Sequence, residues 1–177
     1  ISHHKYSKIT VLIILFNLLH IIRKCPKILC VSEITSCHLK GYIINNLGVS
    51  KVVVLDSSAL LCVLNGEAGA DRVAQVLPSA VIGAANLAEV VTKLRERGLS
   101  AEEVEEVLGG LQLDVRPFTP TQAYATGHLR PATRTLGLSL GDRACLALAA
   151  ELGVAALTAD QAWSSADVGV TVEVIRG

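Results

Sequence analysis

The sequence predicts an α/β fold, a three-layer α/β/α domain with a mostly parallel central sheet of about 4-5 strands. Along residues 51–177, short aliphatic runs alternate with longer segments in which apolar residues recur at helical spacing. This alternation implies right-handed crossovers and a parallel sheet covered on both faces. Hydrophobic residues make up 51% of the chain and charged residues 18%, which excludes a disordered chain. Aromatic residues make up only 3%, so the core is expected to be aliphatic.

The first strand is expected at residues 52–55, where three valines and a leucine form a run that ends at Asp56. After a turn, residues 59–64 have the apolar spacing of a helix. Two glycines then interrupt the chain before a second helix at 70–77. The next β-branched run predicts a second strand at 80–82.

Residues 84–97 are predicted to form a helix with one apolar face. That face consists of Leu87, Val90, Val91 and Leu94. Ser100 and Glu103 have the spacing of a capping box, which predicts the start of another helix. The acidic run at 102–106 is then the solvated face of this helix.

A third strand is expected at 113–118. Thr119 and Pro120 place an N-cap and a first-turn proline at the start of the next helix. Pro131 is expected to break or kink that helix, because proline cannot donate a backbone hydrogen bond.

A very apolar helix is expected at 143–152, entered through Leu-Gly-Asp at 140–142. A strand at 154–157 and a last strand at 170–175 complete the predicted sheet. The sequence contains no internal repeat.

The net charge of zero is a cancellation between two different parts of the chain. Residues 1–50 carry six basic groups and one acidic group, whereas residues 51–177 carry ten basic and fifteen acidic groups. The first part has ten isoleucines and the second has two, and the chain contains no methionine. We expect 1–50 to be an N-terminal extension of doubtful origin that need not be native, with the natural start close to Val52.

An apolar run at 11–22 is the main feature of this extension. It is shorter than the roughly 20 residues needed to cross a bilayer, and Asn17 and His20 interrupt it. The residues after it lack the small side chains of a signal-peptide cleavage site. A secretory signal, a membrane helix and an accessory helix remain as alternatives, of which we favour the last and expect no membrane contact.

The cysteines suggest neither disulfides nor a zinc site. Cys25, Cys30, Cys37 and His38 lack the paired C-x-x-C spacing of common structural zinc sites. Cys62 and Cys145 lie in apolar helical patterns and are expected to be buried free thiols, as is usual in a reducing cytoplasm.

Four acidic residues are placed where they can converge. Asp56 and Asp160 each follow a strand, and the carboxyl ends of parallel strands form the functional edge of such a sheet. Glu89 lies in the helix after the second strand, and Asp142 lies at the start of the apolar helix. Clustered carboxylates repel one another unless a cation neutralises them. Oxygen ligands without thiolate or imidazole favour Mg²⁺ or Mn²⁺, for which phosphodiester hydrolysis is the natural chemistry.

Each acid also has an ordinary explanation. Asp56 and Asp142 could be helix N-caps or first-turn acids that complement the helix dipole. Glu89 could be a solvent-facing helix residue, and Asp160 could cap a short helix around Trp163. The joint placement of all four acids favours the metal site.

The residues around these acids resemble the PIN-domain ribonucleases, and among them the VapC-like toxins of bacterial toxin–antitoxin pairs. The matching stretches are VVVLDSSALL (52–61), AANLAEVVTKL (84–94), LSLGDRACLALA (138–149) and LTADQAW (157–163). They lie in the family's order, and none of residues 1–50 is covered.

The resemblance implies a PIN-like fold and a metal-dependent endoribonuclease that is a toxin. The catalytic and metal-binding residues are then Asp56, Glu89, Asp142 and Asp160, holding Mg²⁺ or Mn²⁺. The implied partners are an RNA substrate, a cognate VapB-like antitoxin and a second copy of the chain, in the cytoplasm. The apolar helices around 59–64 and 73–77 are candidate docking surfaces for the antitoxin.

Three further residues are expected to support the site by matching position. Ser57 resembles the small hydroxyl residue that the family places after the first Asp, although it could also be a helix cap. Asn86 lies one helical turn before Glu89 and could orient that carboxylate, and Thr158 could do the same for Asp160. Gln161 departs from the basic residue common at that position of the family.

RNA binding by an acidic domain requires local positive charge. Five basic residues are expected to form a basic rim around the acids for RNA binding: Lys93, Arg97, Arg130, Arg134 and Arg143. The signal for this rim is weak, and the alternative is that they are scattered surface charges. Other functions also remain open. They are a PIN-like RNA-processing nuclease that is not a toxin, a catalytically inert binding module, and an aspartyl-phosphate phosphatase, although the last usually needs a second Asp where Ser58 stands.

Overall fold

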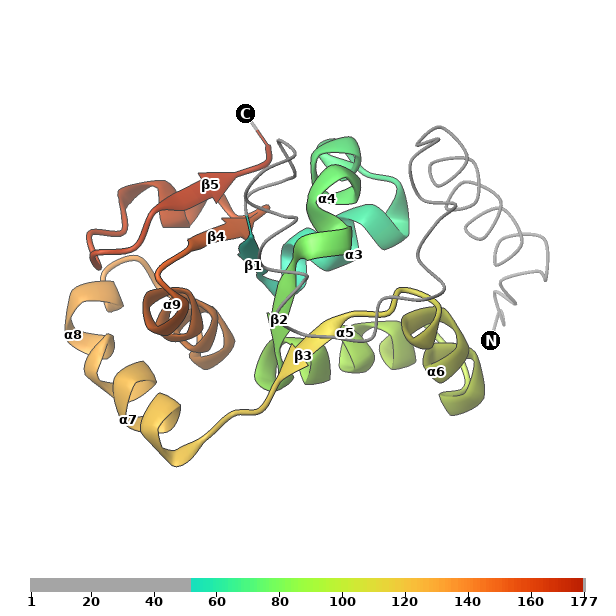
Figure 1. Cartoon of the computed structure of the whole chain (residues 1–177), viewed down its shortest axis with the longest axis horizontal. Coiled ribbons are helices and arrows are strands. Elements are labelled where there is room, and N and C mark those ends of the chain that lie inside the picture. Colours follow the sequence, from blue (N-terminus) through green and yellow to red (C-terminus); the bar gives the residue numbers. More distant parts are fainter. Residues whose placement is uncertain (1–51, 177) are drawn as a thin grey trace, which may run out of the picture. The chain divides into compact units, whose positions relative to one another are not determined.

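The computed structural model describes residues 52–176, whose arrangement is shown in Figure 1. The expectations for residues 1–50 lie outside the described residues: the extension, its apolar run at 11–22, and the cysteine and histidine side chains between 25 and 38. Within the described residues, no helix is long and apolar enough to span a membrane.

A parallel sheet forms the centre of the described residues. Its five strands are β1 (Val53–Leu55), β2 (Val81–Gly83), β3 (Asp114–Arg116), β4 (Ala155–Thr158) and β5 (Val172–Val174). They lie in the order β3-β2-β1-β4-β5, and every neighbouring pair is parallel. β1 is central, because Val54 pairs with Val81 on one side and with Ala156 on the other. The predicted α/β class and parallel sheet are confirmed.

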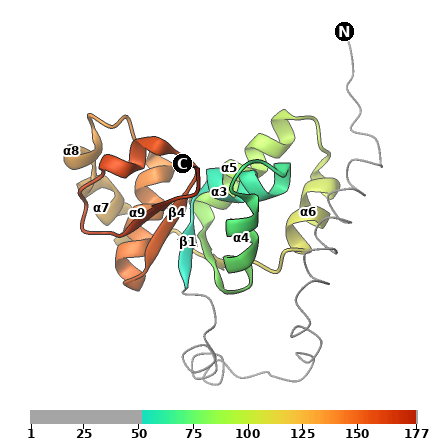
Figure 2. The ribbon, with the colours of Figure 1, turned by 90° about the horizontal axis from the view of Figure 1, so that it is seen from above.

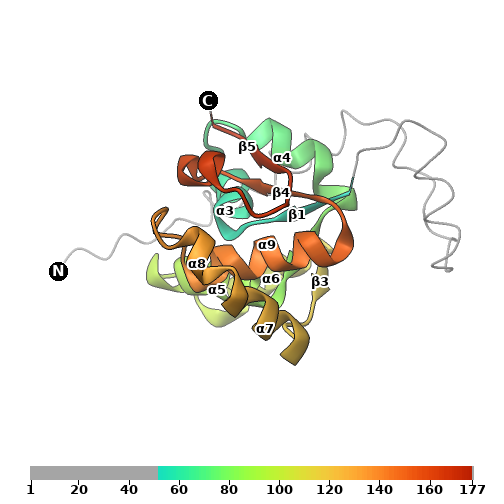
Figure 3. The ribbon, with the colours of Figure 1, turned by 90° about the vertical axis from the view of Figure 1, so that its left-hand side faces the viewer.

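Helices cover both faces of this sheet. They are α3 (Ser57–Asn65), α4 (Ala70–Val76), α5 (Ala84–Glu96), α6 (Ala101–Gly109), α7 (Pro120–His128), α8 (Arg130–Thr133) and α9 (Leu140–Leu152), with 3-10 helices η1 (Leu77–Ser79) and η2 (Gln161–Ser165). Figure 2 shows α7, α8 and α9 on one side of β1 and β4, and α3 and α4 on the other. Figure 3 shows α7 and α8 beside α9.

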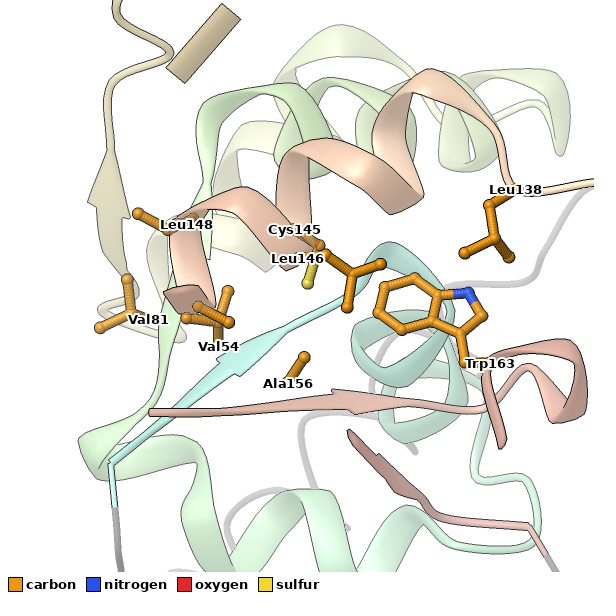
Figure 4. Packing of buried hydrophobic residues seen from close by; sticks show 9 residues of the cluster. Val54, Val81, Leu138, Cys145, Leu146, Leu148, Ala156 and Trp163 are labelled. Carbon is orange, nitrogen blue, oxygen red and sulfur yellow. The ribbon is translucent and has the colours of Figure 1, made fainter. Parts of the chain in front are cut away.

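The core is aliphatic, as expected. Alternate strand residues face opposite layers because side chains alternate along a strand. Toward α9, the buried cluster contains Val54, Val81, Leu138, Cys145, Leu146, Leu148, Ala149, Ala156 and Trp163, of which Figure 4 labels all but Ala149. Toward α3 and α4, it contains Val53, Leu55, Ala59, Val73, Val76, Ala80, Ala155 and Leu157. Trp163 is the only buried aromatic side chain among the described residues.

The helices expected to dock a partner also supply core residues. Leu60 and Leu64 of α3 pack in a third buried cluster with Ile82. Val73 and Val76 of α4 are 0% and 1% exposed. The sheet and the neighbouring helices therefore cover one side of these helices, while Leu61, Val63 and Leu77 are only partly buried. Docking of the antitoxin on these helices stays a prediction.

Several helix boundaries follow from local capping, as predicted. The Ser100 hydroxyl accepts the Glu103 N–H at 3.1 Å, and the Glu103 carboxylate accepts the Ser100 N–H at 2.8 Å. The Thr119 hydroxyl accepts the Gln122 N–H at 3.2 Å at the start of α7. These contacts satisfy amide groups that have no partner inside the helix.

The start of one helix differs from the expectation. α9 begins at Leu140, three residues earlier than expected, because Ser139 caps it and Asp142 completes a capping box. The expected break near Pro131 is confirmed, because α7 ends at His128 and Pro131 lies in the first turn of a new short helix, α8. The edge strands β3 and β5 are also shorter than predicted.

Candidate functional site

Asp56 lies where β1 ends and α3 begins, and it is only 2% exposed. Its N–H donates to the carbonyl of Leu157 at 2.9 Å, which extends the pairing of β1 with β4 by one residue. Its Oδ2 accepts the Ser58 N–H at 3.1 Å, so Asp56 is the N-cap of α3. The ordinary explanation of Asp56 as a helix cap thus holds, together with its position at the carboxyl edge of the sheet.

The Asp56 carboxylate accepts hydrogen bonds from side chains of three segments. Asn86 of α5 donates from Nδ2 to Oδ1 at 3.1 Å. The hydroxyls of Ser58 and Thr158 donate to Oδ2 at 2.5 and 3.1 Å. Ser57 makes a longer contact, with its Oγ 3.4 Å from Oδ1. A single carboxylate therefore connects the end of β1 to α5 and to the end of β4.

Burial raises the pKa of Asp56 above its ordinary value, because desolvation disfavours the charged form. The hydrogen bonds from Ser58 and Thr158 oppose this pKa shift, and the negative charge of Asp142 adds to it. The net direction is upward. Asp56 is thus a buried acid that faces a second acid.

Asp142 lies in the first turn of α9, where it is half-buried. Its Oδ2 accepts the Ser139 N–H at 2.6 Å, and its own N–H donates to the Ser139 hydroxyl at 3.1 Å. Cys145 follows one turn later and is fully buried. Burial and the charges of Asp56 and Asp142 raise the pKa of the Cys145 thiol well above its usual range. Cys145 is therefore an uncharged core thiol, as expected, and Cys62 is likewise free and buried.

Glu89 lies in the second turn of α5 and approaches the start of α9. A Cβ atom added at Gly141 would lie 2.8 Å from Glu89 Oε2, so a larger residue there would require the end of the Glu89 side chain to shift. Asn86, one turn earlier, donates from the same Nδ2 to the Gly141 carbonyl at 3.2 Å and to Asp56. The expectation that Asn86 orients Glu89 is wrong, because its amide binds Asp56 and Gly141 instead.

Asp160 follows β4 and is exposed. Its carboxylate accepts the Ala162 N–H at 2.9 Å and caps η2, which contains Trp163. Thr158 accepts the Asp160 N–H at 3.1 Å, but its hydroxyl donates to the Asp56 carboxylate. Thr158 thus contacts the backbone of Asp160 rather than its carboxylate, which corrects the expected contact.

The structure brings the four acids to one edge of the sheet without joining them into a ready set of ligands. Within residues 52–176, no three His, Cys, Asp or Glu side chains are positioned to hold a metal ion together. In the same residues, none of the four acids forms an ion pair with a basic side chain. A donor set of carboxylates without a compensating cation fits a hard divalent ion such as Mg²⁺ or Mn²⁺. Binding one would require the side chains to rotate toward one another.

The basic residues expected around the site have local partners. Arg143 donates from Nε to the Ser139 carbonyl and from Nη1 to the Thr126 carbonyl, each at 3.1 Å. Arg130 donates to the Leu138 carbonyl at 3.3 Å. These two arginines therefore lie beside the start of α9, next to Asp142, and support the loop that enters it.

The other three basic residues are exposed. Lys93 pairs with Glu96 at 3.0 Å, and Arg97 donates to the side chain of Asn65. Lys93 lies in the C-terminal half of α5 and Arg97 is its C-cap residue, both beyond Glu89. Arg134 follows α8. A continuous basic rim is not evident from these contacts.

Two residues of the site were missed from the sequence. Ser58 binds Asp56 more closely than Ser57 does, at 2.5 against 3.4 Å. Ser139 holds the backbone at Asp142. The S-x-x-D spacing of Ser139 and Asp142 is a capping-box signal that could have identified the second. No local pattern distinguishes Ser58 from Ser57.

Comparison with known proteins gives a family match. The model of a family described as the PIN domain matches residues 53–169, more than half of the 177 residues. No curated protein matches the sequence.

Several solved structures share the fold. The VapBC2 complex from Rickettsia felis, bound to a DNA fragment from their promoter, contains a chain with 12% identity and a TM-score of 0.56, over 69% of this chain and 97% of that one. A chain of DNA-bound VapBC from Salmonella typhimurium has 20% identity and a TM-score of 0.55, over 71% of this chain and 98% of that one. A chain of VapBC-1 from nontypeable Haemophilus influenzae has 15% identity and a TM-score of 0.56, over 70% of this chain and 98% of that one. At these identities the likeness establishes the fold.

Proposed function

The chain belongs to the PIN-domain family, and from this premise we propose that it is a metal-dependent endoribonuclease, the toxin of a VapBC-like toxin–antitoxin pair. The family match supports nuclease activity. The VapBC complexes among the structural neighbours support the role of toxin and the presence of a VapB-like antitoxin as partner. Formation of a homodimer and location in the cytoplasm are parts of the same proposal.

The observation that carries the proposal is the pair of acids at the carboxyl end of β1. Asp56 is buried, and the charge of Asp142 adds to the upward shift of its pKa. Burying a carboxylate near another without a cation opposes folding. Such an arrangement is expected where the acids serve a bound cation rather than the stability of the fold.

The proposed ligands of Mg²⁺ or Mn²⁺ are Asp56, Glu89, Asp142 and Asp160. Nucleases with a PIN domain generally use divalent metal ions. When bound, such an ion lowers the pKa of water and stabilises negative charge on phosphate oxygens. The reaction proposed is hydrolysis of an RNA phosphodiester bond.

The surrounding residues have supporting roles in this proposal. Asn86 and Thr158 hold the Asp56 carboxylate by hydrogen bonds of 3.1 Å each, and Ser57 lies within 3.4 Å. The basic residues expected to contact RNA phosphates are Lys93, Arg97, Arg130, Arg134 and Arg143. Arg130 and Arg143 are the best supported of these, because their contacts hold them beside the N-terminus of α9.

Cleavage by the purified full chain tests the proposal. RNA is incubated with Mg²⁺ or Mn²⁺, and the new RNA ends are sequenced. We expect Asp56→Asn to lower the cleavage rate at least about 100-fold, because even the loss of a residue that supports a metal ligand costs about 10- to 100-fold. The matched control is Asp71→Asn, which alters an exposed acid of α4. It should cleave like the unaltered chain.

Three outcomes count against the proposal. Undiminished cleavage by Asp56→Asn would refute the assignment of the site. Absence of RNA cleavage together with rapid hydrolysis of small phosphomonoesters would favour a phosphatase. Absence of both cleavage and cation binding would leave a binding module.

A further inference from the structure

The Ser58 hydroxyl lies between the Asp56 carboxylate and the end of β4. Its Oγ is 2.5 Å from Asp56 Oδ2 and 3.1 Å from Thr158 Oγ1. It also accepts the backbone N–H of Ala159 at 2.9 Å. One hydroxyl therefore connects residues that are about 100 positions apart in the sequence.

The Thr158 hydroxyl has a parallel arrangement. It accepts the backbone N–H of Asp160 at 3.1 Å, and its proton is directed at Asp56 Oδ2, also at 3.1 Å. A hydroxyl has one proton and two acceptor lone pairs. Because each hydroxyl already accepts a backbone N–H, each has its single proton available for the carboxylate.

These contacts divide the two oxygens of Asp56 unequally. Oδ2 accepts three donors, which are the Ser58 N–H, the Ser58 hydroxyl and the Thr158 hydroxyl. Oδ1 accepts the Asn86 amide at 3.1 Å and the longer contact from Ser57 at 3.4 Å. A carboxylate oxygen offers about two lone-pair sites. Oδ2 therefore has more donors than lone-pair sites, whereas one of the two donors to Oδ1 is only the long Ser57 contact of 3.4 Å, which a cation could displace.

Oδ1 is also the oxygen on the side of the other acids. The Asn86 Nδ2 that binds it also binds the Gly141 carbonyl. Gly141 in turn precedes Asp142, and a Cβ atom at Gly141 would lie 2.8 Å from the Glu89 carboxylate. The hydroxyl pair holds Oδ2 on the side of β4, and Oδ1 thereby faces α5 and the start of α9.

We propose that Ser58 is a positioning residue, whose hydroxyl commits Asp56 Oδ2 to the fold together with Thr158 and leaves Oδ1 as the oxygen presented to a divalent cation. This inference rests on the proposed function of the site. The same two hydroxyls bind the backbone at Ala159 and Asp160, so they also fix the separation between Asp56 and the start of η2.

The test uses the full chain and the variants Ser58→Ala and Ser58→Thr. Mn²⁺ affinity is measured by calorimetry, and kcat and KM are measured for RNA cleavage. We expect Ser58→Ala to weaken Mn²⁺ binding about 10- to 100-fold, as is typical when a partner of a metal ligand is lost. It should lower kcat and leave the KM for RNA unchanged, because Ser58 contacts Asp56 and β4. Ser58→Thr retains the hydroxyl and should restore both the Mn²⁺ affinity and kcat.

Ser79→Ala is the matched control, because it removes another half-buried serine hydroxyl, one that donates to the Val76 carbonyl at 3.1 Å. It should bind Mn²⁺ and cleave RNA like the unaltered chain. If Ser58→Ala does not fold, Thr158→Val is measured in its place, with Thr158→Ser as the variant that keeps the hydroxyl. Thr158→Val retains the side-chain volume and should weaken Mn²⁺ binding in the same way.

The outcomes separate this inference from the proposed function. If the unaltered chain binds no Mn²⁺ and cleaves no RNA, both proposals fail. If it does both, and Ser58→Ala or its substitute Thr158→Val does both equally well, only the positioning role is overturned. If Ser58 has a purely structural role, Ser58→Ala will lower the unfolding midpoint and leave the Mn²⁺ affinity of the folded protein unchanged. That result would also overturn the positioning role.

Discussion

Gly141 lies close to the carboxylate of Glu89, because a Cβ atom at Gly141 would be 2.8 Å from Glu89 Oε2. This contact joins the second turn of α5 to the first turn of α9. It places Glu89 beside the residue that precedes Asp142. Glycine at this position thus allows a proposed ligand of the cation to lie where it does.

Gly141→Ala should therefore impair activity without impairing folding. The new methyl group displaces the Glu89 carboxylate, and a misplacement of about 1 Å can cost about 100-fold in rate. Alanine within a helix is about 0.5–1 kcal/mol more stable than glycine, so the free energy of unfolding should stay the same or rise. Urea unfolding and RNA cleavage measure the two effects.

The control for this change is Gly127→Ala in α7, where an added Cβ atom meets nothing within 4 Å. It should stabilise the protein by a similar amount and leave RNA cleavage unchanged. Equal cleavage by Gly141→Ala and Gly127→Ala would contradict a role for the position of Glu89.

The raised pKa of Asp56 predicts how stability depends on pH in the presence of a chelator. The unfolded pKa is about 3.9. Above that pH the folded protein binds more protons at Asp56 than the unfolded chain does, so the Asp56 contribution to stability declines until the pH passes the folded pKa. Asp56→Asn removes this contribution.

We expect the free energy of unfolding of the unaltered chain, minus that of Asp56→Asn, to fall as the pH rises from 3.5 to 7. Urea unfolding in EDTA at several pH values measures this difference. A difference that rises with pH would mean that hydrogen bonding to the ionised carboxylate outweighs its burial.

Replacing Asn86 by a charged residue should lower the free energy of unfolding more than removing its side chain does. Asn86 is 0% exposed, and its Nδ2 binds both Asp56 and the Gly141 carbonyl. Asn86→Ala removes these bonds and should cost about 1–3 kcal/mol. Asn86→Asp places a buried carboxylate against two acceptors and should cost about 3–5 kcal/mol at pH 7.

The gap between the two Asn86 variants should narrow toward pH 4, where the new carboxyl is protonated. Asn65→Asp, an exposed change at the end of α3, should alter stability by less than about 0.5 kcal/mol. Urea unfolding at both pH values measures all three variants. If Asn86→Asp is as stable as Asn86→Ala at pH 7, Asp56 is not charged beside it.

Alanine substitutions at Gly69 and Gly98 separate the cost of a steric clash from the cost of backbone strain. Gly69 lies at the start of α4 close to Ile175, which follows β5. Gly69 and Gly98 both have a left-handed φ, +96° and +93°. A Cβ atom at Gly69 would lie 2.7 Å from the Ile175 carbonyl, whereas one at Gly98 meets nothing within 4 Å. Gly98→Ala should cost about 1–2 kcal/mol from φ alone.

Gly69→Ala should cost about 1–3 kcal/mol more, because the backbone at Ile175, directly after β5, must move to admit the methyl group. Thermal or urea unfolding of the two variants gives the difference. Equal destabilisation would show that the approach of Ile175 to Gly69 contributes nothing to stability.

Much of the fold was predictable because it depends on short-range patterns. The Ser100–Glu103 capping box, the Thr119 cap and the alternation of strands with helices all arise within a few residues of one another. The four acids were identifiable by their positions after strands and at helix starts. Strand ends at β3 and β5 were predicted less well, because edge strands pair on one side only and their length depends on a neighbour.

The contacts of the site were less predictable. The spacing of Asn86 and Glu89 suggested a bond between them, but Asn86 faces Asp56, which is 30 residues away. Ser57 and Ser58 are equivalent in sequence, yet only Ser58 reaches Thr158 and Ala159 at the end of β4.

By itself, then, the sequence determined the order of the elements, the parallel α/β class and which acids lie at the carboxyl edge of the sheet, because each of these depends on periodicity and capping within one segment. Only the tertiary structure decided that β1 lies between β2 and β4, and hence that Asp56 is buried among Asn86, Ser58 and Thr158. Hydrogen bonds between residues about 100 positions apart require the strand order and register, which no local pattern contains.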